Sequence, residues 1–298
     1  VLFRSYGLNS IVLCNTGADS LTQINMDNYN LMKIHFNISE SPVGPHGIKS
    51  YNKKIITANN YSDSISIFEG NKLTEKKNIK IGPNPNDLIL VDNKIYVICG
   101  ESNAVVIYDL LEERVIFEVH SGSWPHSIDY CRRKMISFVA NLEENSVSII
   151  ALNDNNVVSS LVTPEYPSKV KVSSDEKLLY VCESYLGSDE EGYLDIFSID
   201  NLERVTRLEV GTSPIDLCED EENIYVSNFT DGTISVIDRN ELKVTNSIFV
   251  GGMPRGLISY NKKLYIGDYL KGRLIVVEEN SIKKVIAIES EPNAMTLF

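Results

Sequence analysis

Short runs in which apolar residues alternate with polar ones recur along nearly the whole chain. Examples are residues 64–67 (SISI) and 233–238 (TISVID). Alternation with a period of two is typical of β-strands that bury one face. Turns rich in Asp, Asn and Glu separate these runs, and no segment keeps the 3.6-residue period of an amphipathic helix. The pattern therefore predicts an all-β protein.

The predicted strands are grouped into units that are each marked by a proline. Seven prolines follow one another at steps of 40, 40, 42, 47, 40 and 38 residues. Four strands of about 5–6 residues and four connections of about 4–5 residues make a unit of about 36–44 residues, the size of a propeller blade. We therefore predict a seven-bladed β-propeller with four antiparallel strands per blade. The repeat prolines are Pro45, Pro85, Pro125, Pro167, Pro214, Pro254 and Pro292.

The two ends of the chain supply complementary parts of one blade. Residues 11–15, 20–24 and 31–36 provide only a second, third and fourth strand, whereas residues 293–298 provide only a first strand. Joining them removes two unpaired sheet edges. We therefore predict that the C-terminal strand closes the ring and that residues 9–298 form a single domain.

Residues 1–8 are interpreted as a leader that is non-native or disordered. The first five residues (VLFRS) read like the translated end of a sequencing adapter, and the chain has no initiator methionine. We exclude these residues from the reasoning about the fold.

Composition excludes several classes of function. The formal net charge of −13 repels phosphate backbones, so we expect no nucleic-acid partner. No run of about 18 apolar residues is present, so we expect no membrane span. The five cysteines are an odd number without a C-x-x-C pair, which argues against a disulfide framework or a zinc site. We expect a monomer in the cytoplasm, although a lost leader would make it secreted or attached to a surface.

Three segments carry a recognisable motif. Residues 223–228 (NIYVSN), 233–238 (TISVID) and 250–254 (VGGMP) follow the pattern Y-V-x-N, V-S-V-I-D and V-G-x-x-P. In these motifs the chain resembles the YVTN (YncE-like) family of seven-bladed β-propellers, over essentially residues 11–298. Related WD40-like propellers include surface-layer repeats, lactonase-like proteins and the propeller domains of nitrous oxide reductase and cytochrome d1 nitrite reductase. The resemblance therefore implies a fold but no particular reaction.

Two sets of residues are expected around the mouth of the central channel, where propellers usually hold ligands. One set follows the repeat prolines, and the other ends the second strand of each blade. The first set is His46, Asn86, His126, Ser168, Ile215, Arg255 and Asn293. The second set is Asn15, Asn59, Cys99, Asn141, Glu183, Asn228 and Asp268. The residues predicted to bind a ligand are His46, Asn86, His126, Ser168, Glu183, Arg255, Asp268 and Asn293.

Each of these predictions has a structural alternative. His46 and His126 suit a metal or acid–base pair, but they also suit capping of the open backbone of the innermost strands. Only Asn86 lies between them in the ring, so we predict no metal and no cofactor. The asparagines favour a structural role in tight loops. Glu183 and Asp268 replace that asparagine in two blades, which indicates either a ligand, a pairing with Arg255 or a simple surface substitution.

Three further features of the sequence are a long loop, an acidic run and a set of aromatic residues. The loop 184–192 is about five residues longer than its counterparts, which suits a lid, a cation-binding loop or a solvated excursion, although its acidic residues lack the spacing of an EF-hand. The acidic run 219–222 (EDEE) is interpreted as a solvated hairpin turn. Aromatic residues near the rim suit either a stacking platform or packing between blades. These aromatic residues are Tyr61, Trp124, Tyr185, Phe229 and Tyr269.

The sequence contains no G-x-S-x-G, H-E-x-x-H, G-x-G-x-x-G or P-loop motif. We therefore predict a non-enzymatic scaffold that binds a small molecule or a protein at the polar channel mouth. The alternative is a lactonase-like hydrolase, although Ser168 and Ile215 interrupt its ring of chemical groups. In that hydrolase His46 or His126 would be the base, Arg255 would stabilise an oxyanion, and Glu183 or Asp268 would orient the base.

Overall fold

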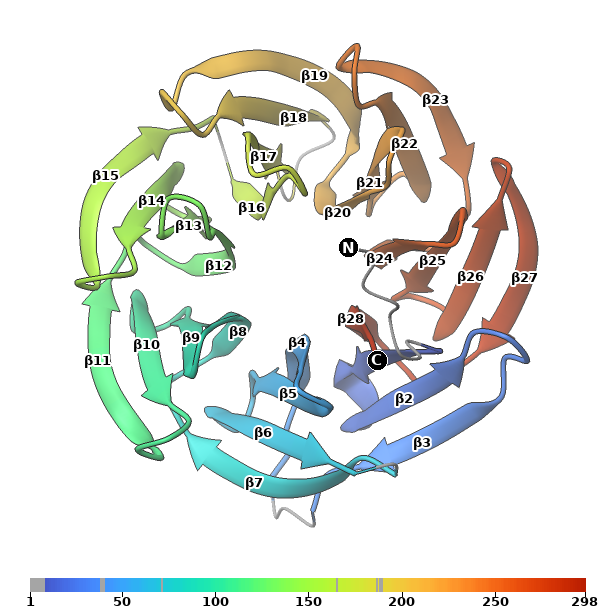
Figure 1. Ribbon diagram of the computed structural model, residues 1–298. Coiled ribbons are helices and arrows are strands. Elements are labelled where there is room, and N and C mark those ends of the chain that lie inside the picture. Colours follow the sequence, from blue (N-terminus) through green and yellow to red (C-terminus); the bar gives the residue numbers. More distant parts are fainter. Residues whose placement is uncertain (1–8, 38–40, 71, 165, 186, 188–189) are drawn as a thin grey trace, which may run out of the picture.

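The computed structural model describes residues 9–37, 41–70, 72–164, 166–185, 187 and 190–298. Its strands form seven four-stranded antiparallel sheets arranged around a central channel (Figure 1). This confirms the predicted all-β seven-bladed propeller. Within the described residues the single helix is one 3-10 turn, η1 (Thr16–Ala18). The expected leader at residues 1–8 lies outside the described residues.

The blades are numbered along the chain, and the innermost strand comes first in each. Blade 1 contains β4 (Pro45–Tyr51), β5 (Lys54–Asn59), β6 (Ser64–Glu69) and β7 (Thr74–Lys80). Blade 2 contains β8 (Pro85–Val91), β9 (Lys94–Cys99), β10 (Ala104–Asp109) and β11 (Arg114–His120). Blade 3 contains β12 (Pro125–Cys131), β13 (Ile136–Asn141), β14 (Ser146–Ala151) and β15 (Asn156–Val162). Blade 4 contains β16 (Pro167–Val172), β17 (Leu178–Glu183), β18 (Glu191–Ser198) and β19 (Arg204–Thr212).

The remaining blades complete the circle. Blade 5 contains β20 (Pro214–Glu219), β21 (Asn223–Asn228), β22 (Thr233–Asp238) and β23 (Lys243–Phe249). Blade 6 contains β24 (Pro254–Tyr260), β25 (Lys263–Asp268), β26 (Arg273–Glu278) and β27 (Ser281–Ala287). Blade 7 contains β28 (Pro292–Leu297), β1 (Ser10–Asn15), β2 (Ser20–Asn25) and β3 (Leu31–His35).

Blade 7 closes the ring as the sequence predicts. Its strand order is β28-β1-β2-β3, so the last strand of the chain pairs antiparallel with the first. The backbones of Ser10 and Phe298 exchange two hydrogen bonds, of 3.1 and 2.8 Å. The pairing satisfies backbone groups that would otherwise form open sheet edges.

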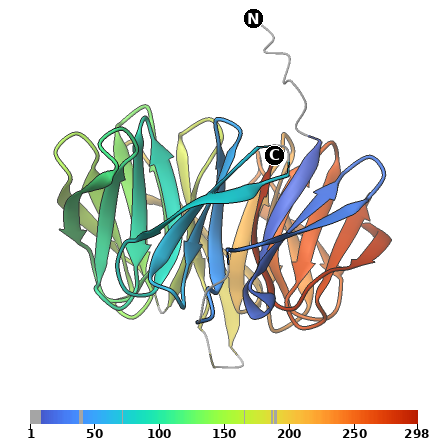
Figure 2. The same ribbon diagram turned by 90° about the horizontal axis from the view of Figure 1, so that it is seen from below.

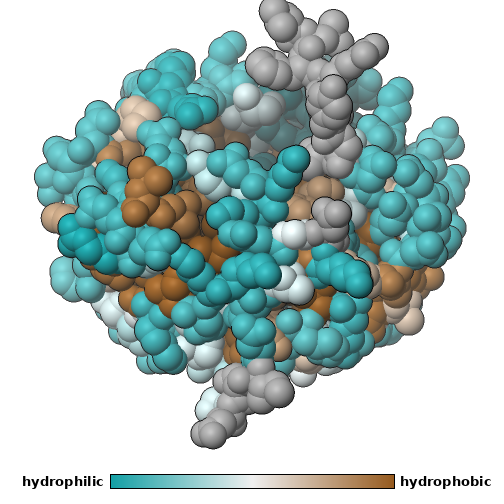
Figure 3. All heavy atoms as spheres, turned by 60° about the horizontal axis from the view of Figure 1, so that its bottom comes forward, coloured by the Kyte–Doolittle hydropathy of each residue, from teal (hydrophilic) through white to brown (hydrophobic). Residues whose placement is uncertain are grey.

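The strands of each blade run between two faces of the ring (Figure 2). On one, which we call the proline face, Pro45 and its equivalents begin the innermost strands. On the other, which we call the terminal face, β28 ends and β1 begins. The outer side of the ring is mainly hydrophilic, with smaller apolar patches between polar side chains (Figure 3).

The core consists of apolar layers between neighbouring blades. Ile56 and Ile65 of blade 1, for example, pack in one cluster with Leu88 and Val97 of blade 2. Both faces of each sheet are buried in this way, which explains why inner strands such as β9 read as continuous apolar runs. All five cysteines are buried free thiols within these layers. No helix in the described part of the chain has the length and hydropathy needed to cross a bilayer.

Candidate functional site

A β-bulge follows each repeat proline and shapes the channel. In blade 1, Pro45 pairs with Asn59 and Gly47 pairs with the next residue, Ala58, so His46 is the extra residue. The equivalent register shift occurs between Pro85 and Asp87 in blade 2, and in the other blades. A bulge places two successive residues opposite one and redirects their side chains. As a result, both residues after each proline line the channel.

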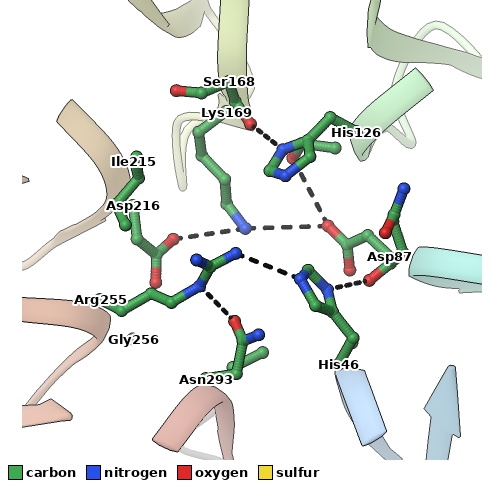
Figure 4. A pocket seen from close by; sticks show the side chains of 14 residues that line it. His46, Asp87, His126, Ser168, Lys169, Ile215, Asp216, Arg255, Gly256 and Asn293 are labelled. Carbon is green, nitrogen blue, oxygen red and sulfur yellow. Dashed lines mark hydrogen bonds and ion pairs between the residues drawn. The ribbon is translucent and has the colours of Figure 1, made fainter. Parts of the chain in front are cut away.

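Fourteen residues therefore surround the channel, two from each blade (Figure 4). The space between them has a volume of about 40 Å³. A water molecule needs about 10–15 Å³ of such volume, so the channel has room for a few waters or one small polar group. The predicted members of the ring are all present, namely His46, Asn86, His126, Ser168, Ile215, Arg255 and Asn293.

The two histidines are held in one tautomer by the next blade. His46 Nδ1 lies 2.8 Å from the Asn86 carbonyl oxygen, and His126 Nδ1 lies 2.7 Å from that of Ser168. A carbonyl only accepts, so Nδ1 carries the proton and Nε2 is an acceptor in each neutral ring. Burial, then the Arg255 charge and His126, lowers the pKa of His46 to about 3, and burial and Arg255 lower the pKa of His126 to about 4. Both rings are neutral at physiological pH.

Arg255 connects three blades at the channel. Its Nε donates to Asn293 Oδ1 at 2.6 Å, and its Nη2 donates to His46 Nε2 at 3.1 Å. Its guanidinium carbon also lies 5.5 Å from the ring centre of Tyr269, within the range of a cation–π contact. The proton acceptor of His46 is therefore already used, whereas Nε2 of His126 has no hydrogen bond within the described residues.

Asn86 and Ser168 bond across blade boundaries. Asn86 Nδ2 donates to the Pro125 carbonyl at 3.4 Å, and Ser168 Oγ donates to the Pro214 carbonyl at 2.7 Å. Each of these residues therefore fixes the start of the next innermost strand while its backbone lines the channel. The bonds of His46 and His126 to the carbonyls of Asn86 and Ser168 are of the same kind, and they fit the backbone-capping alternative stated for the histidines.

The sequence analysis did not predict the charged residues that stand two positions after the repeat prolines and also line the channel. Lys169 Nζ lies 3.3 Å from Asp216 Oδ1 and 3.7 Å from Asp87 Oδ2, so one ammonium bridges two carboxylates across the channel (Figure 4). Burial would lower the pKa of Lys169, but Asp216 and Asp87 outweigh it and raise the pKa. Burial raises the pKa of Asp87, but the charges of Lys169 and Lys49 bring it below its ordinary value. Charged residues inside otherwise apolar inner strands were the available signal.

In blades 1 and 6, the residue two positions after the repeat proline is a glycine, and a neighbouring innermost strand lies close to it. A Cβ atom on Gly47 would lie 2.7 Å from the Asn86 carbonyl oxygen, and one on Gly256 would lie 2.1 Å from the Asn293 carbonyl oxygen. Any larger residue would push two innermost strands apart. These two glycines therefore set the width of the channel on the side of blades 1 and 6.

The asparagines that end the second strands lie inside the blades and do not line the channel. Asn59 Nδ2 donates to Ser64 Oγ at 3.0 Å and to Ser66 Oγ at 2.8 Å. Asn15, Asn141 and Asn228 make the same pair of bonds to hydroxyls five and seven residues later. All four are fully buried. They tie the second strand to the third, which supports the structural interpretation.

Asp268 and Glu183 occupy the same buried position, so the expectation that they reach the channel mouth has to be corrected. Asp268 forms a 2.7 Å ion pair with Arg273, five residues later, and not with Arg255. It also accepts the backbone N–H of Met253 at 3.0 Å. Asp268 and Arg273 replace the asparagine and the hydroxyl residue that form this pair in other blades. The alternation of the strands turns both side chains away from the channel.

Glu183 has no such partner. Its side chain is completely buried, and neither carboxyl oxygen has a hydrogen bond within the described residues. Asp195 stands where other blades have the second hydroxyl, and it is held by Arg207 at 2.9 Å. Burial, followed by the charge of Asp195, raises the pKa of Glu183 to about 9. Glu183 is therefore a neutral acid at physiological pH.

Several of the aromatic residues expected near the rim can be described. Phe229 and Tyr269 pack edge to face at 5.8 Å, beside Arg255. Tyr61 is 57% exposed, which leaves much of its ring available to a ligand. Trp124 has a left-handed backbone (φ 53°) and its carbonyl accepts a hydrogen bond from the Leu142 backbone.

The long loop of blade 4 can be described only in part. Tyr185 packs edge to face against Tyr193 at 6.1 Å. Residues 186 and 188–189 lie outside the described residues, so the lid and cation-loop expectations stay predictions. Across the ranges that the structure describes, no group of three or more His, Cys, Asp or Glu side chains is placed to hold a metal ion.

Comparison with known proteins bears on the fold. No family model matches the sequence, and no curated protein matches it either. Among solved structures, hydrazine synthase of Kuenenia stuttgartiensis is similar, with a TM-score of 0.72, 16% identity and coverage of 87% of this chain and 91% of that chain. A candidate 6-phosphogluconolactonase from Bacteroides fragilis has a TM-score of 0.76, 13% identity and coverage of 96% and 97%.

A third similar structure is dihydro-heme d1 dehydrogenase NirN in complex with DHE. Its TM-score is 0.71 at 15% identity, and the match covers 96% of this chain and 65% of that chain. The chain shares its propeller fold with all three. At such identities the likeness shows the fold alone, because one scaffold carries unrelated functions.

Proposed function

We propose that this chain is a non-enzymatic binding propeller that takes a small molecule or a protein at the polar mouth of its central channel. The observation that carries this proposal is the convergence of hydrogen-bonding side chains from all seven blades on one small channel. Lys169 and Arg255 are donors there, and Nε2 of His126 is an acceptor. The resemblance to the YVTN repeat family supports a scaffold of this kind.

The size of the channel defines how a ligand would bind. A volume of about 40 Å³ is far below the range of about 300–1,000 Å³ for sites that enclose a whole ligand. A ligand therefore inserts one small polar group between His126, Lys169 and Arg255. The rest of the ligand lies on the proline face, beside Tyr61 and Tyr269.

A thermal-shift screen of small molecules, together with a pull-down from native lysate, tests this proposal. A ligand at about 100 times its Kd adds about 2.7 kcal/mol to the free energy of unfolding, which raises Tm measurably. The shift should disappear in His126→Ala and persist in Glu118→Gln, which alters an exposed residue of the outermost strand of blade 2. A flat screen and an empty pull-down would contradict the proposal.

A lactonase-like hydrolase is the second candidate, and the likeness to the Bacteroides fragilis protein supports it. The channel geometry is less favourable to it. His46 Nε2 is bound to Arg255, and His126, with a pKa of about 4, is a weak base near neutral pH. Neither Glu183 nor Asp268 is near enough to orient a histidine. Hydrolysis of 6-phosphogluconolactone that is lost in His126→Ala would favour this candidate over the first.

A further inference from the structure

A groove opens on the terminal face between blades 5 and 6, far from the channel mouth. It has a volume of about 680 Å³, within the range of about 300–1,000 Å³ typical of ligand pockets. The turn from β20 to β21 forms one wall, and the turns that follow β24 and β26 form the other. Every residue that lines the groove is among those that the structure describes.

The floor of the groove is apolar and aromatic. Leu264 and Val277 are buried beneath it, and the half-buried ring of Tyr225 lies along it. Tyr225 donates its hydroxyl hydrogen to Asp220 Oδ2 at 2.8 Å. The floor therefore presents aromatic surface in a fixed orientation.

The polar groups on one side of the groove hold the two blades together. Ser259 of blade 6 donates to Asp220 Oδ2 of blade 5 at 3.4 Å. Glu219 turns away from the groove and accepts from Arg239 at 3.3 Å and from the Tyr180 hydroxyl at 3.2 Å. Glu219 and Asp220 are therefore structural. Their bonds hold this wall of the groove in place before any ligand binds.

The rim carries negative charge that the protein does not neutralise. Glu221, Glu222 and Glu279 are exposed, and none of them makes an ion pair in the part of the chain that the structure describes. Lys262 is the nearest compensating charge on the rim, since Arg239 is engaged by Glu219 and Ser174. The net charge of −13 for the whole chain strengthens the attraction for cations.

We propose that this groove binds an arginine-containing basic segment of a partner protein. A guanidinium group can stack on the face of Tyr225 while it donates paired hydrogen bonds to the rim carboxylates. The apolar methylene chain of arginine suits the floor over Leu264 and Val277. Charge complementarity thus selects a basic segment, and the aromatic floor favours arginine over lysine.

Fluorescence anisotropy with a fluorescein-labelled peptide of alternating arginine and glycine tests the proposal. The wild-type protein should bind it with an affinity that falls as salt rises. The double variant Glu221→Gln/Glu222→Gln should bind about tenfold more weakly, because rim charges are lost while the walls stay intact. Tyr225→Leu should weaken binding of the arginine peptide more than binding of its lysine counterpart, at unchanged net charge.

The matched control is Glu101→Gln/Glu118→Gln, which removes the same charge from exposed positions of blade 2. It should change the affinity by less than about twofold, as expected for distant screened charges. Equal weakening in both double variants, or no binding to the wild type, would overturn the proposal.

Discussion

Replacing Glu183 with glutamine removes a buried acid of blade 4 that has no hydrogen-bond partner in the described part of the chain. The folded protein keeps this carboxyl protonated up to a pKa of about 9, whereas an ordinary glutamate loses its proton near 4.5. The unfolded state therefore releases a proton that the folded state retains. The contribution of Glu183 to stability is present below about pH 4.5 and is lost progressively as the pH rises towards 9.

Each pH unit between those two values lowers the free energy of unfolding by about 1.4 kcal/mol. At about pH 7 the accumulated cost is about 3 kcal/mol, the product of the 2.5 units above 4.5 and this slope. Glutamine has nearly the same shape and no charge to lose. Glu183→Gln should therefore stabilise the protein by about 3 kcal/mol at about pH 7.

Urea denaturation of both proteins at a series of pH values from about 5 to 8.5 measures this difference. The stabilising effect should be less than about 1 kcal/mol near pH 5 and should grow steadily towards alkaline pH. Glu101→Gln, at an exposed position of blade 2, is the control and should not change the curve. A difference between wild type and Glu183→Gln that is absent or independent of pH would refute the reasoning.

Three further predictions concern the ring and the channel. Deletion of residues 293–298 should lower Tm sharply in a circular dichroism melt, because β28 is the strand that closes blade 7. Asn59→Ala should cost about 1–3 kcal/mol in urea denaturation, because the buried Thr57 hydroxyl loses its acceptor, whereas Ser64 and Ser66 keep Asn78 as a donor. NMR of the imidazole nitrogens should show His46 and His126 as neutral Nδ1–H tautomers from about pH 5 to 8. Since their pKa values are lowered, stability should fall as the pH drops below about 6.5.

Each of these three predictions would be contradicted by a particular measurement. Unchanged cooperativity and Tm after the deletion would mean that the ring does not depend on closure by β28. A cost below about 0.5 kcal/mol for Asn59→Ala would mean that water satisfies the Thr57 hydroxyl that Asn59 leaves. Titration of either histidine near its ordinary pKa would mean that the channel is far wetter than the distances indicate.

The fold was accessible from the sequence because its determinants are local and repeated. Pro45, Pro85 and their equivalents mark the same backbone turn in each blade, and a strand pattern recurs behind each of them. The incomplete units at the two ends left one arrangement that paired every edge. Closure of blade 7 by β28 then followed from hydrogen-bonding needs alone.

The site was only partly accessible, because its geometry depends on a departure from regular alternation. A regular strand would turn Lys169 and Asp216 away from the side occupied by Ser168 and Ile215. The bulge turns them towards the channel instead. The reverse error occurred at Asp268, since proximity to the mouth in sequence did not reveal that its side chain points into the blade. Side-chain direction at bulges is set by tertiary packing that a single sequence does not display.

The seven bulges also have a consequence for which residues of this protein can be substituted. Because each adds a residue whose side chain points to the channel and not into the layers between blades, several of the positions around the channel can vary with little effect on the packed core. The exceptions include Gly47 and Gly256, where a neighbouring strand lies too close, and Asn86 and Ser168, which bond across blade boundaries. New binding properties can therefore arise by substitution at single positions, without insertions and without loss of the ring. A library randomised at the remaining positions would sample many different channel chemistries on one stable frame.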